Sequence, residues 1–241
     1  MKILAIDSSG LVASVAVLED DKLLAEYTVN YKKTHSQTLM PMLDEISKMI
    51  DLDLNTLDAI AISNGPGSFT GLRIGAASAK GIGLAINKPI VEVSTVEGLA
   101  FNLCGSSEYV CPIMDARRNE VYTGIFAFEK NAENGQYDMN TILEPVPVSI
   151  FDLLAKINEI GKSVIFTGDG IDVYKDIIAE NIRVDYSFAL PGLNRQSARS
   201  VGILGMRYFV EGKSVSARDS APIYLRLSQA ERELQEKNKL G

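Results

Sequence analysis

The sequence predicts an α/β protein of two similar lobes around a cleft, and three observations support this. Both halves follow the same order of elements, three strands, a helix, a strand and a helix. Both open with an apolar strand that ends in an aspartate, at residues 3–7 and 111–115. The composition, with 46% hydrophobic and 23% charged residues, is that of a globular protein. Ligands of α/β sheets bind beyond the carboxyl ends of strands, so both aspartates are expected near the cleft.

The first half contains the elements of the first lobe, which is predicted to span residues 1–104. Apolar runs and alternating patterns predict strands, and apolar residues at every third or fourth position predict helices. The predicted strands are Lys2–Asp7, 12–18, 22–30, Ala59–Ser63 and Ile90–Val93, and the predicted helices are 36–50, 70–86 and 95–103. Asp20 and Asp21 form a hairpin turn. Thr95 is a candidate N-cap of the third helix.

The second half repeats this order over residues 105–228, the predicted second lobe. Its predicted strands are 109–114, 120–128, a weaker one within 141–148, Val164–Thr167 and 182–184, and its predicted helices are Ile150–Ile160, 171–180 and 198–211. Helix 198–211 is a candidate for packing back on the first lobe. Residues 229–241 alternate acidic and basic side chains, which predicts a solvated charged tail.

Charge and rare residues exclude several classes of function. The formal net charge of −7 argues against a protein that grips nucleic acid alone, because such proteins carry a basic surface. A single histidine, His35, excludes multi-histidine metal sites, and a structural role is favoured for it. Cys104 and Cys111 lack the spacing of a zinc or redox pair. No apolar stretch approaches the ~20 residues of a membrane span, so we expect a cytoplasmic protein.

Residues 65–75 are the strongest local motif, with glycines around the start of helix 70–86. The motif lacks the spacing of a Walker phosphate loop, so a tight turn before a closely packed helix is favoured over phosphate binding. Gly71, Gly75, Ala79 and Gly83 then recur every four residues as a ridge without side chains. Each helical glycine costs about 1 kcal/mol, so the ridge needs a close neighbour, either inside the fold or across a subunit interface.

Helix 36–50 predicts an apolar surface that the core does not cover. Met40, Met42 and Met49 lie on it, and Met40 cannot share one narrow face with the adjacent Leu39. Methionine is frequent on adaptable binding surfaces, and exposed apolar patches mark partner sites. This pattern favours a protein–protein interface on this helix.

Two turns and one hairpin tip are further candidates. In two-lobed ATPases, turns like that of Asp7, Ser8 and Ser9 hold a phosphate and its Mg²⁺, and a turn placed like Gly168-Asp169 closes over adenosine. Plain strand-terminal turns are favoured on spacing alone. Arg117 and Arg118 lie between Asp115 and Glu120, which indicates a solvated turn or, less readily, a partner contact.

Four segments together resemble one family. The segments are 6–9 (IDSS), 34–36 (THS), 64–75 (NGPGSFTGLRIG) and 114–122 (MDARRNEVY), and they are similar to those of the bacterial TsaB (YeaZ) family over essentially the whole chain. The resemblance implies the duplicated actin/Hsp70/sugar-kinase fold. It also implies a part in forming N6-threonylcarbamoyladenosine next to the tRNA anticodon, where the paralogue TsaD carries the catalytic metal and the ATPase TsaE joins the complex.

The resemblance further implies that the first two helices, 36–50 and 70–86, form a dimer surface with TsaD. When TsaD is absent, the apolar helices are expected to pair with a second copy through the same surface. The predicted interface residues are Leu39, Met40, Leu43, Gly71, Leu72, Gly75, Ala79 and Gly83. Gly71→Arg or Gly75→Arg is then expected to block the heterodimer while the monomer stays folded.

Departures from TsaD predict that this chain is not the enzyme. TsaD holds its metal with a His-x-x-x-His motif, whereas here His35 is followed four residues later by Leu39. Asp7, Ser8, Ser9, Gly168 and Asp169 are then remnants of a nucleotide site, with ATP and Mg²⁺ used by the complex rather than by this chain alone. The missing histidines also argue against the peptidase activity with which the family is grouped.

Contacts with the other components and one alternative function complete the predictions. Arg117 and Arg118 are candidate contacts to TsaE or tRNA, and tRNA is expected to be bound through the complex. The alternative is an ATP-dependent small-molecule kinase with Asp115 as base, although the turn at 7–10 lacks the second glycine usual there.

Overall fold

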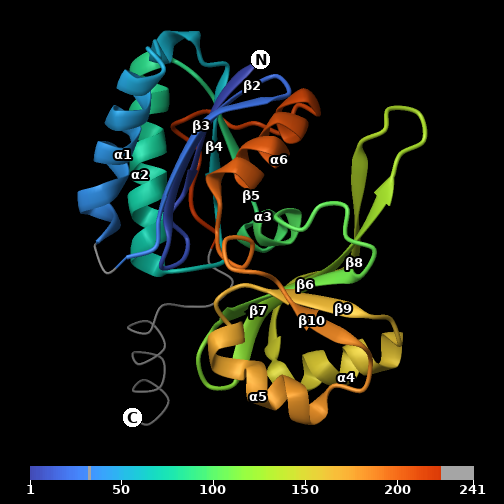
Figure 1. Cartoon of the computed structure of the whole chain (residues 1–241). Helices are drawn as coiled ribbons and strands as arrows, with labels where there is room; N and C mark the ends of the chain where they lie inside the picture. Colours follow the sequence, from blue (N-terminus) through green and yellow to red (C-terminus); the bar gives the residue numbers. More distant parts are fainter. Residues whose placement is uncertain (32–33, 224–241) are drawn as a thin grey trace, which may run out of the picture.

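The computed structural model describes residues 1–31 and 34–223, which form two lobes (Figure 1). The first lobe contains the strands β1 (Lys2–Asp7), β2 (Ala13–Glu19), β3 (Lys22–Val29), β4 (Ala59–Ser63) and β5 (Ile90–Val93), in the sheet order β3-β2-β1-β4-β5. The second contains β6 (Tyr109–Asp115), β7 (Glu120–Lys130), β8 (Tyr137–Ser149), β9 (Val164–Thr167) and β10 (Tyr186–Phe188), in the order β10-β9-β6-β7-β8. In both sheets the first strand is antiparallel to the second and parallel to the fourth. This shared topology confirms the predicted duplicated fold.

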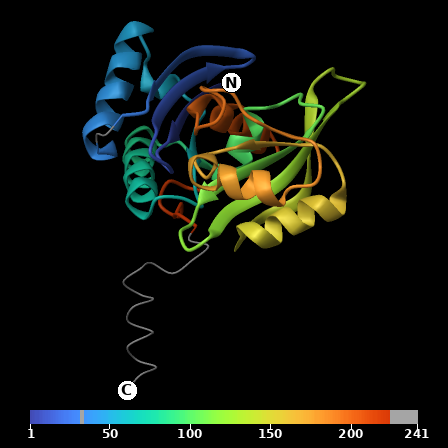
Figure 2. The same ribbon diagram turned by 60° about the horizontal axis from the view of Figure 1, so that its bottom comes forward.

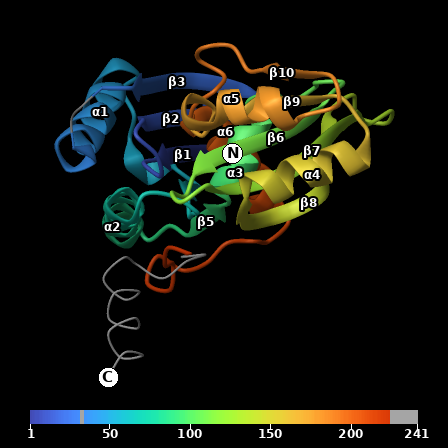
Figure 3. The same ribbon diagram turned by 90° about the horizontal axis from the view of Figure 1, so that it is seen from below.

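The helices cover both sheets in layers. The first sheet carries α1 (His35–Met49) and α2 (Phe69–Ile86) side by side on its outer face (Figures 1 and 3). The second carries α4 (Ile150–Ile160) and α5 (Ile171–Asn181) on its outer face (Figure 2). Between the sheets lie α3 (Thr95–Phe101) and α6 (Ala198–Val210), and a short 3-10 helix, η1 (Leu54–Thr56), precedes β4.

The core explains why β1 is apolar throughout. Leu4 and Ile6 pack in the cluster with α1 and α2, whereas Ile3 and Ala5 pack in the cluster with α6. A strand buried on both faces requires a continuous apolar run rather than an alternating pattern. The cluster around α6 also contains Phe126 of β7, in the second lobe, so the two lobes share a core.

Several element predictions differ from the structure. Residues 182–184 are not a strand, because Ile182 ends α5 through its bond to the Ile178 carbonyl and the strand begins at Tyr186. The third strand of the second lobe is β8, longer than the predicted 141–148; it lies at a sheet edge, where proline is tolerated. Thr95 is not the N-cap of α3, since Ser94 occupies that position without a side-chain bond. The 3-10 helix η1 was not predicted.

The chain after the second lobe returns to the first. Helix α6 packs on the first sheet, Val215 pairs with Ile90 of β5, and Lys80 donates from Nζ to the carbonyls of Arg218 and Ser220. The described chain from residue 198 onward therefore lies against the first lobe. The predicted tail at 229–241 lies outside the described residues. Within the described residues, none of the helices has the length and apolarity needed to cross a membrane.

Candidate functional site

A cleft of about 1060 Å³ lies between the lobes, where the turns after β1 and β6 face each other. The first lobe contributes Ser9, Gly10, His35, Ser68 and Thr70 among others, and the second contributes Met114, Asp115, Arg117, Tyr122 and Asp169. Of the residues in the predicted sites, Ser9, Gly71, Asp115, Arg117 and Asp169 line the cleft. Asp7, Ser8 and Gly168 do not line it.

Asp7 is buried beneath the turn that follows β1. Its side chain is 2% exposed and accepts hydrogen bonds from the Ser9 N–H at 2.9 Å, the Ser9 hydroxyl at 2.6 Å and the Ser63 hydroxyl at 2.5 Å. Burial raises the pKa of Asp7, and these three bonds oppose that rise. The carboxylate is therefore held inside the lobe. Because it is buried and does not line the cleft, it is not placed to hold the Mg²⁺ that a nucleotide site of this fold would have in the cleft.

Ser8 joins the same turn to α2. Its hydroxyl donates to the Gly71 carbonyl at 2.9 Å. A Cβ on Gly71 would lie 2.0 Å from the Ser8 carbonyl oxygen, and one on Gly75 would lie 2.4 Å from Ser8 Oγ. Gly71 and Gly75 thus pack against Ser8 inside the fold. The backbone contact at Gly71 argues against a larger side chain there, and whether Gly71→Arg or Gly75→Arg leaves the monomer folded stays a prediction.

Asp115 occupies the matching position after β6, but it lines the cleft. It accepts from the Tyr174 hydroxyl at 3.0 Å and from the Arg117 N–H at 2.9 Å. The Arg117 guanidinium lies 3.6 Å from its other oxygen. Burial and the neighbouring Asp115 carboxylate raise the pKa of Tyr174 to about 12. Two protein donors therefore already hold this carboxylate.

The turn after β9 approaches β6 closely. Gly168 has φ +104°, and a Cβ there would lie 2.3 Å from the Ile113 carbonyl oxygen, so glycine is required. Asp169 lines the cleft, and its Oδ1 has no hydrogen-bond partner in the described part of the chain. Burial raises the pKa of Asp169, and Arg195 opposes the rise.

His35 ties the start of α1 to the turn after β1. Its Nε2 lies 2.8 Å from the Gly10 carbonyl oxygen, and since a carbonyl only accepts, Nε2 carries the proton of this bond. The other nitrogen, Nδ1, is buried without a partner among the described residues. Residues 1–31 and 34–223 contain no group of three or more His, Cys, Asp or Glu side chains placed to hold a metal.

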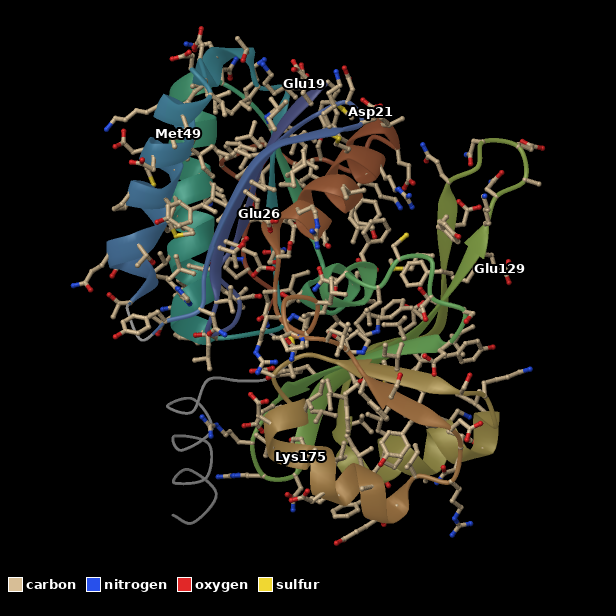
Figure 4. All side chains as sticks on the ribbon, viewed as in Figure 1. Glu19, Asp21, Glu26, Met49, Glu129 and Lys175 are labelled. Carbon is tan, nitrogen blue, oxygen red and sulfur yellow. The ribbon has the colours of Figure 1, made fainter. Side chains whose placement is uncertain are left out.

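The predicted interface residues on α1 and α2 need correction. Of the eight, only Met40 is exposed, at 47%; Leu39, Leu43, Gly71, Leu72, Gly75, Ala79 and Gly83 are buried in the first lobe. The large apolar side chains that these helices present to solvent are Met40, Met49, Phe69 and Leu84, with Met49 on the outer side of α1 (Figure 4). Phe69 and Leu84 are not among the predicted interface residues. Whether this surface binds a partner stays a prediction.

The hairpin tip between β6 and β7 has an unusual backbone. The tip has three exposed residues with positive φ: 66° at Arg117, 58° at Arg118 and 59° at Asn119. Arg117 also lines the cleft. The two arginines are thus presented to solvent at the mouth of the cleft, and their predicted contact with TsaE or tRNA stays a prediction.

Comparisons with known proteins place the chain in a family. A family model described as TsaD, tRNA N6-adenosine threonylcarbamoyltransferase, matches residues 22–234. The chain is 32% identical over 234 residues to the tRNA threonylcarbamoyladenosine biosynthesis protein TsaB of Bacillus subtilis, with 96% of each covered. It is 29% identical to TsaB of Escherichia coli, covering 97% of this chain and 98% of that one.

Solved structures agree with the sequence relatives. A YeaZ structure from Pseudomonas aeruginosa has a TM-score of 0.71 at 26% identity and covers 93% of this chain and 99% of its own. A second Pseudomonas aeruginosa structure, of a protein described as similar to the peptidase YeaZ, has a TM-score of 0.78 with the same identity and coverage. The chain therefore belongs to the TsaB (YeaZ) family, within the wider family that the TsaD model describes.

Proposed function

We propose that this chain is a non-catalytic, cytoplasmic subunit in the formation of N6-threonylcarbamoyladenosine in tRNA, and that it binds a TsaD paralogue and a TsaE ATPase. Its relatives are named as tRNA threonylcarbamoyladenosine biosynthesis proteins. The observation that carries the non-catalytic part is Asp7, whose carboxylate accepts three hydrogen bonds inside the first lobe. This carboxylate is 2% exposed and does not line the cleft, so it is poorly placed to reach a catalytic metal there.

The partner surface in this proposal is the outer side of α1 and α2. Met40, Met49 and Leu84 expose apolar side chains there, and such surfaces mark partner sites. Without TsaD, two copies of the chain would pair through the same surface. The net charge of −7 supports leaving most tRNA contact to the other subunits.

Reconstitution tests the function. The purified chain is combined with TsaD, TsaE, the enzyme that forms the threonylcarbamoyl adenylate, ATP and a tRNA transcript, and the modified nucleoside is measured by mass spectrometry. We expect full modification with all components and none when either this chain or TsaD is omitted. Modification of tRNA by this chain without TsaD would overturn the proposal.

Surface variants test the interface separately. Leu84→Asp and Met40→Asp should weaken the complex with TsaD at least tenfold, by light scattering and calorimetry, because a carboxylate would be buried in an apolar contact. Val173→Asp is the matched control, since Val173 is also an exposed apolar side chain, at 55%, but lies on α5 of the second lobe. Equal effects of all three variants would show that the outer side of α1 and α2 is not the interface.

The kinase alternative requires the isolated chain to bind nucleotide. We expect no saturable heat when Mg-ATP is titrated into the chain alone, with ATP and Mg²⁺ used only in the complex. Tight binding with turnover by the isolated chain would favour the kinase.

A further inference from the structure

A small cavity lies where the two lobes meet, outside the interlobe cleft. Its volume is about 180 Å³, and its walls are Asn64, Gly65, Pro66, Glu92, Val93, Ser94, Pro145 and Ile223. Pro145 comes from β8 of the second lobe, whereas the other walls come from the first lobe and from the chain after α6. None of these residues lines the cleft, so the cavity is a separate feature of the molecule.

The walls of this cavity present mainly apolar surface to an occupant. The side-chain amide of Asn64 and the hydroxyl of Ser94 are buried. Glu92 Oε1 already accepts two hydrogen bonds. The other walls are glycine or apolar residues, namely Gly65, Pro66, Val93, Pro145 and Ile223. The cavity therefore suits an apolar side chain rather than a polar ligand, and leaving it empty would cost the surrounding atoms their contacts.

Residues 216–223, here called the strap, bring the chain to the cavity. The Ser220 hydroxyl and the Ala221 N–H donate to Glu92 Oε1 at 2.7 and 3.2 Å. The Ile223 N–H donates to the Asn64 carbonyl at 2.8 Å. Ile223 is itself a wall of the cavity and is exposed. The described chain thus ends at a fixed place, directly beside apolar surface that the described residues leave uncovered.

The sequence that follows Ile223 supplies apolar side chains within reach of the cavity. Residues 224–241 lie outside the described residues; they begin with Tyr-Leu-Arg-Leu and continue with mainly polar and charged residues. In an extended chain, side chains two positions apart point to the same side and are about 6.6 Å from each other. Leu225 is therefore the nearest apolar side chain that an extended chain would turn to the same side as Ile223.

We propose that the Leu225 side chain fills this cavity and that residues 224–227 thereby fasten the two lobes to each other. The volume equals that of about six water molecules at roughly 30 Å³ each, which is enough for one leucine side chain. Docking is intramolecular, so the effective concentration of Leu225 at the cavity is in the millimolar range and a weak contact suffices. The occupant joins Val93 of the first lobe to Pro145 of the second. This inference does not depend on the proposed role in tRNA modification.

Thermal unfolding of the full chain without partners tests the docking. Leu225→Ala should lower the Tm by roughly 3–8 °C, because most of an apolar side chain leaves the cavity. Leu234→Ala is the matched control in the same terminal segment and should change the Tm by less than about 2 °C. Ile223→Ala should also lower the Tm, and the double variant with Leu225→Ala should lose less than the sum, because the two side chains share one cavity.

Amide hydrogen exchange shows where the effect arises. In Leu225→Asp the amide of Ile223, which donates to the Asn64 carbonyl, should exchange at least tenfold faster, because apolar walls do not accommodate a carboxylate and the end of the strap is released. The amide of Gly161, which donates to the Ile157 carbonyl in the second lobe, is the control and should be unchanged.

Three results would overturn the proposal. The first is a Tm of Leu225→Ala equal to that of the wild type or of Leu234→Ala. The second is strict additivity of Ile223→Ala and Leu225→Ala, which would place Leu225 away from the cavity. The third is an unchanged exchange rate at Ile223 in Leu225→Asp. Because every measurement uses the chain alone, these results are separate from the outcome of the tRNA-modification assay.

Discussion

The turns after β1 and β6 are equivalent by duplication, yet their aspartates lie in different surroundings. Asp7 is buried and bonded to Ser9 and Ser63 within its own lobe. Asp115 lines the cleft and is held by Tyr174 and Arg117. The first turn joins β1 to α2 and keeps its aspartate inside, although its Ser9 and Gly10 line the cleft, whereas the second turn places its aspartate on the cleft wall. One fold can therefore keep the same residue at both positions and use it for packing in one and for the cleft in the other.

The largest expected effect is at Gly71, where α2 packs against the turn after β1. Gly71→Ala should lower the free energy of unfolding by about 3 kcal/mol, because its Cβ would meet the Ser8 backbone oxygen, which cannot move aside cheaply. Gly81→Ala is the matched control on the same helix, since a Cβ there meets nothing within 4 Å, and it should raise stability by up to about 1 kcal/mol. Urea unfolding measures both. Equal effects would mean that the turn after β1 is not a packed joint.

The pH dependence of the free energy of unfolding tests the burial of Asp7. Because the pKa of Asp7 is raised in the folded protein, the folded state keeps a proton that the unfolded chain has lost between the two pKa values. The contribution is complete below the unfolded pKa and is lost as pH rises through the folded one, at about 1.4 kcal/mol for each pKa unit of difference. Asp7→Asn should remove this slope, as measured by urea unfolding between pH 4 and 8. An unchanged slope would show that Asp7 titrates alike in both states.

Asp115 should give a smaller effect and a different signature. Asp115→Asn weakens the bond from the Tyr174 hydroxyl, at a cost of about 1 kcal/mol in stability. It should also lower the pKa of Tyr174 from about 12, because the neighbouring negative charge is removed while burial remains. Ultraviolet titration of the tyrosines measures this shift, with Tyr174→Phe identifying the signal. A pKa of Tyr174 that does not change would contradict the contact.

The architecture was more predictable from sequence than the site, for physical reasons. Strands such as β1 and β6 are buried on both faces, so they can be recognised in the sequence as continuous runs of apolar residues. Strand β10 was misplaced, because Ile182 and Val184 are apolar while the true strand is fixed by Tyr186 and Phe188 packing on Phe166. That contact joins residues about twenty positions apart, and no local pattern encodes it.

The glycine ridge of α2 shows why the site was harder to predict from the sequence. Spacing every four residues correctly indicates that something approaches Gly71 and Gly75 closely, but the same spacing serves a neighbour inside or outside the fold. The neighbour is Ser8, more than sixty positions away in the chain, and only the fold brings it there. Likewise, the serines that satisfy Asp7 include Ser63 at the end of β4, which no local motif connects to β1.

The smallest expected effect is at the hairpin tip of the second lobe, where Arg118 has a left-handed backbone at φ 58°. Such a conformation costs a residue with a side chain about 1–2 kcal/mol, and glycine adopts it freely but loses more entropy on folding. Arg118→Gly should therefore raise the free energy of unfolding by less than about 1 kcal/mol, whereas Arg118→Val should lower it. If Arg118→Gly reduces tRNA modification in the reconstituted system although the chain is no less stable, and Arg118→Lys restores it, the positive charge contacts a partner. If modification is unchanged, the tip is a solvated turn.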